Sequence, residues 1–234
     1  MVTRTLRVLS IRLATPRTRF ISLDLNGEQL VFQAGQAVMV GLHGSQLRKP
    51  YSIASAPSEA KRSGRLDLLL QLEDSGGPDP HLELAEKGTL LDLEGPFGSF
   101  GLPDLTPVEG LLFVAGGTGI APLRSMLIER LTAEQPPAMA VVYSARSADE
   151  LVYASEIEGL ARTGRIRAFL TVTRDASTTW SGRRGRIDRE LLEQALPSRD
   201  ALCLLCGPPE LLDAARQWLV ALGVRGECIL TEAF

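Results

Sequence analysis

The chain has 234 residues, of which 44% are hydrophobic and 23% charged, and its formal net charge at pH 7 is −3. This length suffices for one large domain or for two domains of roughly 100–150 residues each. The small net charge favours neither nucleic acid nor a membrane surface as a partner.

Charge is unevenly distributed along the sequence. Residues 1–70 hold ten lysines and arginines against four aspartates and glutamates, an excess of six positive charges, which leaves −9 for the remaining residues. A basic N-terminal third favours encounter with an acidic protein partner. A chance excess of cations on a solvated surface is the alternative.

The cysteines and the N-terminus indicate the compartment. Cys203, Cys206 and Cys228 are too few for a disulfide framework, which fits a reducing environment, and an iron–sulfur cluster usually needs about four cysteines. The first residues alternate in polarity and lack the apolar core of a signal peptide, and no apolar run approaches the roughly 18 residues that span a membrane. We therefore expect a cytoplasmic protein with no membrane segment and no metal.

The first hundred residues read mainly as strands. Alternating apolar residues predict strands over 6–13, 20–25, 37–42, 66–72 and 90–93. Asn26-Gly27 is a tight-turn signal between two of them. Short strands at this spacing predict an antiparallel barrel. One helix is predicted over 80–87, with Asp79 as its N-cap and Gly88 as its C-terminal stop.

After a proline-containing linker at 103–107, strands alternate with helices. The pattern predicts strands over 111–115, 138–144, 166–173, 201–206 and 227–231, and helices over 119–133, 149–161, 188–195 and 208–222. Such alternation indicates a parallel sheet with helices on both faces. The expected fold is thus an all-β antiparallel barrel domain, residues 1–103, followed by an α/β parallel-sheet nucleotide-binding domain, residues 108–234.

The stretch Gly116-Gly117-Thr118-Gly119 joins a buried strand to an amphipathic helix. Glycines let a backbone approach a ligand, and the N–H groups and dipole at a helix start favour an anion such as a pyrophosphate. The turn is neither the Rossmann G-x-G-x-x-G nor a P-loop, because no Lys-Ser/Thr pair follows. It predicts a nucleotide site at the carboxyl end of a strand, with a turn that merely needs glycine as the alternative.

Four stretches in a fixed order carry a family resemblance. They are Lys49-Pro50-Tyr51-Ser52-Ile53-Ala54-Ser55, Gly95-Pro96-Phe97-Gly98, Gly116-Gly117-Thr118-Gly119-Ile120-Ala121-Pro122 and Cys206-Gly207-Pro208-Pro209. Over nearly its whole length the chain resembles the ferredoxin–NADP reductase superfamily. The resemblance implies that the barrel domain, 1–103, binds FAD and that the α/β domain, 108–234, binds NAD(P).

On the flavin side the family motif is Arg-x-Tyr-Ser. The resemblance implies that Tyr51 packs on the flavin and that Ser52 contacts its reactive N5 side. Lys49 takes the place of the phosphate-binding arginine, which keeps the charge without the planar fork, and Arg48 beside it is a second candidate.

A second phosphate contact in the family comes from a Gly-x-x-Ser/Thr turn. This chain offers Gly76-Gly77 at that place, and no hydroxyl follows them. Backbone N–H groups at Gly77 are then the remaining donors. Weaker retention of FAD, or the use of FMN, is therefore the alternative.

On the nicotinamide side, Cys206 matches the family cysteine that lies beside the nicotinamide ring, with Gly207 after it. Cys203 lies three residues away on the same strand, so the two sulfurs point to opposite faces, and a disulfide or metal pair is not expected. Gly117, Thr118 and Gly119 correspond to the family's nucleotide turn, and Thr118 helps to place the nicotinamide.

The chain ends in Glu232-Ala233-Phe234, which resembles the plant-type terminus Glu-x-Tyr. The resemblance implies that Phe234 covers the flavin and that Glu232 belongs to the active site. Together with Ser52 and Cys206, Glu232 is expected to form the catalytic set.

The choice of nicotinamide nucleotide depends on arginines. The second strand of the α/β domain ends in Arg146 rather than in an acid, and further arginines follow at Arg174, Arg183, Arg184 and Arg186. Arginines suit a 2′-phosphate, which favours NADPH. Asp149 and Glu150 are nearby in the sequence, so NADH is the alternative.

These inferences predict a flavoprotein oxidoreductase. It would transfer hydride between NAD(P)H and bound FAD and pass single electrons to a separate carrier, ferredoxin or flavodoxin. A free flavin reductase, a flavin-bearing electron-transfer subunit of a larger complex and a nucleotide-binding module without catalysis are the alternatives.

Overall fold

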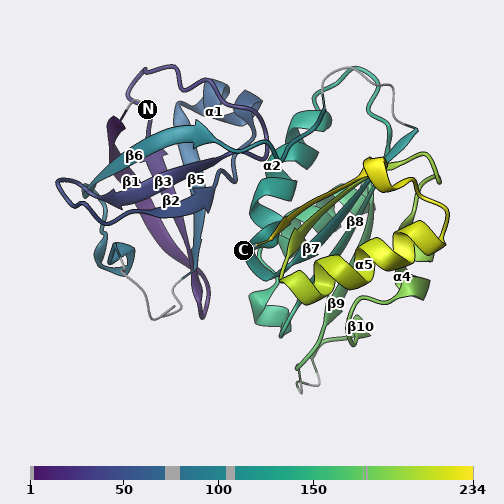
Figure 1. Ribbon diagram of the computed structural model, residues 1–234. Coiled ribbons are helices and arrows are strands. Elements are labelled where there is room, and N and C mark those ends of the chain that lie inside the picture. Colours follow the sequence, from purple (N-terminus) through teal and green to yellow (C-terminus); the bar gives the residue numbers. More distant parts are fainter. Residues whose placement is uncertain (1–2, 72–79, 104–108, 176, 178, 234) are drawn as a thin grey trace. The chain divides into compact units, whose positions relative to one another are not determined.

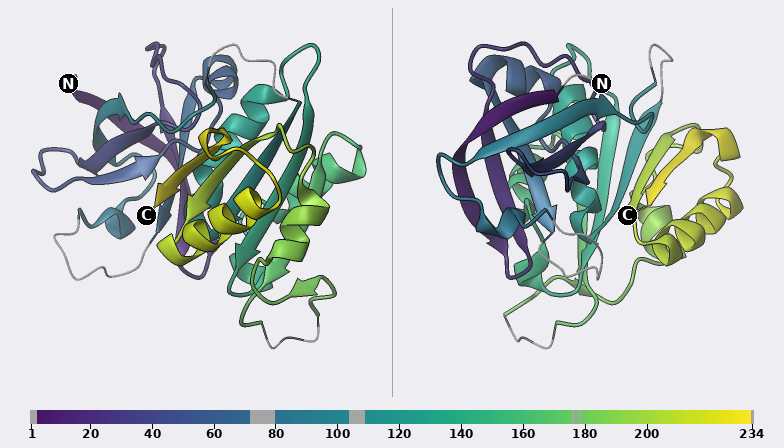
Figure 2. Two further views of the ribbon diagram at one scale, coloured as in Figure 1. Left: turned by 45° about the vertical axis from the view of Figure 1, so that its right-hand side comes forward. Right: turned by 60° about the vertical axis from the view of Figure 1, so that its left-hand side comes forward.

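The computed structural model describes residues 3–71, 80–103, 109–175, 177 and 179–233 (Figures 1 and 2). The chain divides into two compact units, Met1–Leu102 with Arg124–Glu129, and Pro103–Leu123 with Arg130–Phe234. The predicted domain boundary at 103–108 stays a prediction, because residues 104–108 lie outside the described part of the chain.

The first unit is a six-stranded antiparallel sheet in the order β4-β3-β6-β1-β2-β5. A bridge between Ile53 and Leu68 joins the residue after β4 to β5, so the two ends of this order meet and the sheet closes. The predicted antiparallel barrel is confirmed. Its strands are β1 (Thr3–Thr15), β2 (Thr18–Asp24), β3 (Ala37–Leu42), β4 (Lys49–Ser52), β5 (Arg65–Gln71) and β6 (Leu90–Phe97).

The barrel core follows from the two-residue period of its strands. Leu66, Leu68 and Leu70 of β5 are fully buried, and Leu91 and Leu93 of β6 join them in one apolar cluster. Because successive side chains of a strand point to opposite faces, Asp92, which lies between Leu91 and Leu93 on β6, faces away from the apolar cluster.

Two short elements of the first unit were absent from the prediction. Helix α1 (Pro57–Ser63) has proline in its first turn, and its Glu59 carboxylate accepts a hydrogen bond from the N–H of Ala56. The helix ends at Gly64, whose φ of 67° suits glycine. Strand β4 was missed because four residues that include a proline carry no alternation signal.

The helix predicted over 80–87 is wrong. Only Leu82–Leu84 form a single 3-10 turn, η1. His81 before it has a φ of 53°, which a regular helix cannot contain, and Leu84 is 67% exposed, so no continuous apolar stripe forms. Asp79, the predicted N-cap, lies outside the described residues.

The second unit is a parallel sheet in the order β10-β9-β8-β7-β11-β12. This confirms the predicted parallel sheet and adds the two-residue strand β10. The strands are β7 (Gly110–Gly116), β8 (Ala138–Ala145), β9 (Arg167–Val172), β10 (Arg183–Arg184), β11 (Leu202–Gly207) and β12 (Ile229–Ala233). The helices are α2 (Ile120–Arg130), α3 (Ala154–Arg162), α4 (Arg189–Ala195) and α5 (Pro209–Ala221), with 3-10 turns η2 (Gly117–Gly119), η3 (Ala148–Glu150) and η4 (Gly226–Cys228).

Helices lie on both faces of this sheet, as predicted. Helices α4 and α5 cover one face, where Leu192 and Leu219 join the cluster that contains Val142 of β8 (Figure 1). The next residue, Tyr143, points to the opposite face because side chains alternate along a strand. There its hydroxyl accepts a hydrogen bond from the N–H of Val152, just before α3.

The strand register places two predicted motifs at one edge of the sheet. Cys206 of β11 pairs with Ala115 of β7, so the Gly116–Gly119 turn and the Cys206-Gly207 step leave neighbouring strands at their carboxyl ends. Ligands of parallel sheets bind at this edge. Among the described helices, none has both the length and the apolar character to cross a bilayer.

Candidate functional site

The predicted flavin motif lies on β4. Lys49 pairs with Val40 and Tyr51 with Val38, so both side chains are on the strand face of these two buried valines. Tyr51 packs partly against the barrel core. Ser52 is paired with Ala37 and has the opposite orientation. The structure thus places a cation and an aromatic ring two residues apart on one face of β4.

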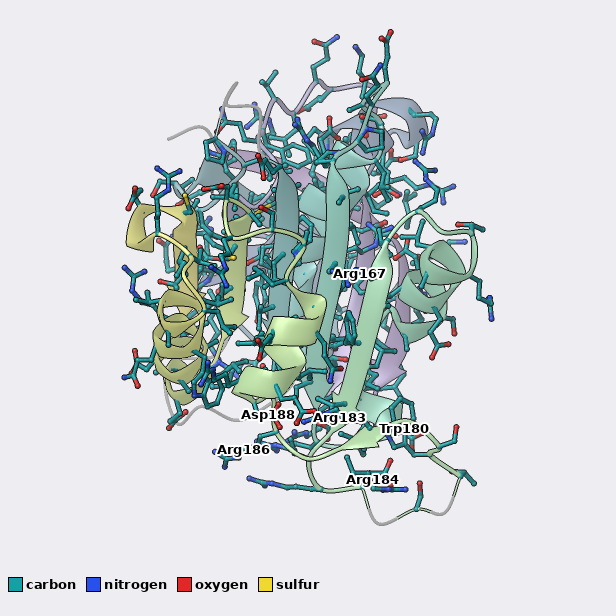
Figure 3. All side chains as sticks on the ribbon, turned by 90° about the vertical axis from the view of Figure 1, so that its right-hand side faces the viewer. Arg167, Trp180, Arg183, Arg184, Arg186 and Asp188 are labelled. Atoms are coloured by element: carbon teal, nitrogen blue, oxygen red, sulfur yellow. The ribbon has the colours of Figure 1, made fainter. Side chains whose placement is uncertain are left out.

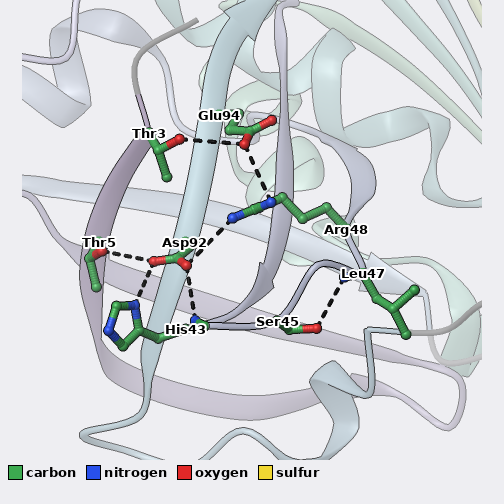
Figure 4. A network of polar contacts seen from close by, with 9 residues as sticks. Thr3, Thr5, His43, Ser45, Leu47, Arg48, Asp92 and Glu94 are labelled. Carbon is green, nitrogen blue, oxygen red and sulfur yellow. Dashed lines mark hydrogen bonds and ion pairs between the residues drawn. The ribbon is translucent and has the colours of Figure 1, made fainter.

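Arg48, the second candidate for the flavin phosphates, contacts carboxylates instead (Figure 4). Its Nη2 lies 3.5 Å from Oδ2 of Asp92 and its Nη1 lies 3.3 Å from Oε1 of Glu94. On β6 these acids alternate with Leu91 and Leu93, so they face away from the barrel core. The guanidinium of Arg48 is therefore balanced by two carboxylates on the outer face of the barrel.

Asp92 is the centre of this network (Figure 4). Its carboxylate accepts hydrogen bonds from Thr5 Oγ1 at 2.7 Å and from the Gly44 N–H at 3.1 Å, and it lies 2.8 Å from His43 Nδ1. Burial raises the pKa of Asp92, but the hydrogen bonds from His43, Thr5 and Gly44 outweigh it and hold the pKa below its usual value. Asp92 is thus an anion that fixes Arg48.

Three predicted cofactor contacts lie outside the described residues. They are Gly76, Gly77 and Phe234. Their roles toward the flavin stay predictions.

The first unit also contains a buried polar cluster that sequence reasoning missed. Arg124 Nη1 donates to the carbonyl oxygen of Ala54 at 2.9 Å and to Glu59 Oε2 at 2.8 Å, and Ser125 Oγ donates to the carbonyl oxygen of Ser55 at 2.8 Å. These contacts join Arg124 and Ser125, which belong to the first unit, to the segment that follows the flavin motif. The sequence signal that could have located α1 is Pro57 with Glu59 two residues later, which is typical of a helix start.

The nucleotide turn has one glycine that is both exposed and left-handed. Gly117 has a φ of 55°, whereas Gly116 and Gly119 are buried. The turn runs directly into α2. Its first residue, Gly116, has no side-chain oxygen that could accept hydrogen bonds from the N–H groups of the turn. Those donors and the helix dipole fit the pyrophosphate of a dinucleotide. Thr118 is half-buried at the same place.

Cys206 and Glu232 lie side by side at the edge of the sheet where β11 and β12 end. They are paired in register, so their side chains share one face. Burial raises the pKa of the Cys206 thiol, and the neighbouring Glu232 charge adds to this, while burial raises the pKa of Glu232. Cys203 points the other way, into the core under α4 and α5, as predicted. In the part of the chain that the structure describes, no cluster of side chains suits a metal ion.

The predicted phosphate-binding arginines fall into two groups. The N–H of Arg174 donates to the carbonyl oxygen of Arg146 at 2.7 Å, so these two exposed residues meet beyond the carboxyl ends of β9 and β8. Arg183 instead forms an ion pair with Asp188 (Figure 3). Arg184 donates to the carbonyl oxygens of Ser177 and Trp180.

Comparisons with known proteins cover both units. Residues 5–101 match the family model described as an oxidoreductase FAD-binding domain, and residues 113–217 match an oxidoreductase NAD-binding domain. Ferredoxin–NADP reductase B of Sorangium cellulosum (strain So ce56) is 36% identical over 191 residues, which cover 80% of this chain and 76% of that protein.

Two further proteins extend this likeness. The xylene/toluene monooxygenase electron transfer component of Pseudomonas putida is 30% identical over 88% of this chain and 59% of its own length. A crystal structure of an Amycolatopsis cytochrome P450 reductase superposes with a TM-score of 0.83 at 26% identity and covers 99% of this chain and 70% of that one. The three names share a reductase or electron-transfer role.

Proposed function

The chain belongs to the ferredoxin–NADP reductase family, and on that premise we propose that it transfers hydride between NAD(P)H and bound FAD and passes single electrons to a separate carrier protein. Bound FAD supplies the conversion between a hydride, which carries two electrons, and two single electrons that leave for two carrier molecules. The protein supplies binding, orientation and polar groups. The observation that carries the proposal is the match of both units to a FAD-binding and a NAD-binding oxidoreductase domain.

We propose Lys49, rather than Arg48, as the cation for the flavin phosphates. Lys49 stands at the arginine position of the family motif and shares a strand face with Tyr51, and the charge of Arg48 is balanced by Asp92 and Glu94. Tyr51 would pack on the flavin ring, Ser52 would contact its reactive side, and Phe234 would cover it. A lysine binds phosphate as a point charge and not as a fork, so flavin affinity should be below that of an arginine-bearing relative.

The nucleotide contacts follow the same logic. We propose that the backbone of the turn at Gly117 and Thr118 binds the pyrophosphate, and that Arg146 and Arg174 bind a 2′-phosphate. Arg146 and Arg174 are both exposed and are joined by a main-chain hydrogen bond beyond the ends of β8 and β9. Two neighbouring arginines at this place support NADPH over NADH. Arg183 is removed from this set because Asp188 neutralises it.

At the nicotinamide we propose Cys206 and Glu232 as the residues beside the reacting ring. Their raised pKa values support a neutral thiol, and a carboxyl that takes up a proton more readily than an exposed glutamate does. An uncharged thiol can pack against a nicotinamide ring without adding a charge next to the atom that gives up the hydride.

For the carrier we propose an acidic protein of the ferredoxin or flavodoxin type. The excess of six positive charges within residues 1–70 supports it by electrostatic steering. The free thiols Cys203, Cys206 and Cys228 support a reducing compartment such as the cytoplasm.

One experiment separates this function from its nearest alternative. The purified protein is assayed for bound flavin by absorbance, and its reduction is followed after mixing with NADPH or NADH, with and without a ferredoxin. Retained FAD that is bleached by nicotinamide and reoxidised by ferredoxin supports the carrier reductase. A protein that binds flavin weakly and reduces added free flavin with multiple turnovers contradicts it. Lys49 is the observation that favours this alternative, because a lysine in place of the family arginine is expected to bind the flavin phosphates more weakly.

A further inference from the structure

Gly119 packs against the backbone of Cys206. A Cβ atom placed on Gly119 would lie only 2.6 Å from the carbonyl carbon of Cys206 and 3.0 Å from the nitrogen of Gly207, and closest of all to the Cys206 carbonyl oxygen. Real Cβ atoms essentially never approach so closely. The turn after β7 and the end of β11 are therefore in contact through a face that has no room for a side chain.

Two more glycines extend this contact. A Cβ on Gly207 would lie 3.1 Å from the nitrogen of Gly116, and a Cβ on Gly116 would lie 2.7 Å from Leu211 Cδ2 and 2.9 Å from Pro208 Cδ. The Gly116–Gly119 turn and the segment Cys206–Pro209 are thus in close contact, with the backbone of one packed against the backbone of the other. Neither Gly116 nor Gly119 has a left-handed φ, so packing and not backbone conformation requires glycine at both.

Gly117 provides the contrast. It is exposed and has a φ of 55°, so it suits the close approach of a ligand to the backbone. Gly119 is buried, and the space in front of it is filled by Cys206. The two glycines of one motif therefore face different neighbours.

We propose that Gly119 is a positioning residue for Cys206: by leaving room for the Cys206 carbonyl, it sets how far the thiol stands from the nicotinamide. This inference rests on the proposed placement of Cys206 beside that ring. A methyl group at position 119 would push the end of β11 away by several tenths of an ångström, and misplacement on this scale lowers rates when reacting groups must meet at contact distance.

The test compares Gly119→Ala with Gly159→Ala in the FAD-loaded protein. Gly159 lies in α3, and a Cβ there would meet only Arg162 Nη2 at 3.9 Å, which makes it a matched control. Three quantities are measured: the hydride transfer rate at saturating NADPH, the dissociation constant of 2′,5′-ADP by calorimetry, and the alkylation rates of Cys206 and Cys203 by peptide mass spectrometry. The ligand 2′,5′-ADP lacks the nicotinamide, and alkylation needs no activity.

For Gly119→Ala we expect the hydride transfer rate to fall about tenfold, while the 2′,5′-ADP dissociation constant changes less than about twofold. Alkylation of Cys206 should accelerate because the strand end is displaced, and that of Cys203 should not change. Gly159→Ala should leave all three quantities as they are. A weaker 2′,5′-ADP complex with unchanged Cys206 reactivity would overturn the inference, because Gly119 would then serve the nucleotide.

A double-mutant cycle shows whether Gly119 acts through Cys206. In a Cys206→Ala background, Gly119→Ala should lower the hydride transfer rate less than about threefold further. A full tenfold loss there would show an independent role and contradict the inference. If Cys206→Ala alone leaves the rate unchanged, the proposed role of Cys206 fails, whereas the alkylation result still reports on the contact itself.

A milder variant covers poor folding of Gly119→Ala. Gly207→Ala brings a Cβ to 3.1 Å from Gly116 on the same contact. It should accelerate Cys206 alkylation by a smaller factor. No acceleration in a folded Gly207→Ala protein would count against the inference.

Discussion

The guanidinium of Arg124 donates two hydrogen bonds to the carboxylate of Glu59, with 2.8 Å between Nη1 and Oε2 and 3.1 Å between Nη2 and Oε1. Only 11% and 23% of the two side chains are exposed. Removing one partner leaves a charge without its counterion in a poorly hydrated place.

We expect Glu59→Gln to lower the free energy of unfolding by about 2 kcal/mol, since a neutral amide cannot balance Arg124. Urea denaturation measures this, and Glu86→Gln, at an exposed position, should change it by less than about 0.5 kcal/mol. The double variant Glu59→Gln/Arg124→Met should lose less stability than the sum of the single variants. Strict additivity would show that the two residues act independently.

The same pair predicts a dependence on acid. Burial raises the pKa of Glu59, but the hydrogen bonds from Arg124 and Ala56 outweigh it, so the folded pKa lies below the ordinary 4.5. The ionised form is therefore favoured by folding, and its contribution is present above pH 4.5 and is lost as pH falls through the folded pKa. The stability difference between the wild type and Glu59→Gln should shrink from pH 7 to pH 4. A difference that grows on acidification would refute this assignment.

Glu232 should behave in the opposite sense. Burial raises its pKa above the ordinary 4.5, so the ionised carboxylate is disfavoured in the folded protein above that value. This penalty is present at neutral pH and vanishes as pH falls below 4.5, where both states are protonated. Glu232→Gln should therefore raise the melting temperature at pH 7.5 and have no such effect at pH 4. A lower melting temperature at pH 7.5 would be inconsistent with burial as the cause.

The two cysteines of β11 allow a matched comparison. Cys206→Ala should lower the hydride transfer rate by about tenfold or more with FAD content little changed, and because Cys206 is also buried it should cost about 1 kcal/mol of stability. Cys203→Ala creates a small cavity under α4 and α5, so it should cost about 1 kcal/mol of stability and leave the rate within about twofold. Stopped-flow reduction and urea denaturation measure the two quantities. The reverse pattern would place the reacting ring elsewhere.

The arginines should separate NADPH from NADH. Arg146→Ala and Arg174→Ala should each reduce the ratio of kcat/KM for NADPH to that for NADH by about tenfold, because a charge-assisted contact with the 2′-phosphate is lost. Arg183→Ala, which removes the ion pair with Asp188, should leave this ratio unchanged. Steady-state kinetics with both nucleotides decide the matter, and equal losses for both nucleotides would show that Arg146 and Arg174 do not read the phosphate.

Periodicity was enough to predict the type of both sheets, but not their short strands β4 and β10. Leucines at every second position of β5 indicate a strand that buries one face, as in a barrel. The unbroken apolar run of β7 indicates a strand that is buried on both faces, as in a parallel sheet covered by helices. What periodicity could not supply were contacts made by partners distant in sequence. The partners of Arg48 are on β6, more than 40 residues away, and those of Arg124 lie around α1, so neither pairing has a local signal. Seven-residue α1 is too short for a helical stripe to be visible.

The nucleotide motif shows the same limit in another form. Its glycines are expected as ligand contacts, and the structure shows in addition that Gly116 and Gly119 pack against protein neighbours while Gly117 is exposed. A glycine needed for packing and a glycine needed for ligand approach look identical in a sequence. Only the position of the β11 backbone distinguishes them.

Arg124–Glu129 belong to the first unit although they follow it in the sequence by more than twenty residues. This grouping limits where two related proteins can be joined in a chimera. A fragment that stops at residue 103 would lack Arg124, and the N–H of Ser58 would lose the Glu129 carboxylate to which it donates at 2.9 Å. A chimera that takes its first hundred residues from one parent and the rest from another would pair an α1 and an α2 that were never selected together. Successful exchanges should therefore carry the α2 segment along with the barrel, although the two are separated in the sequence.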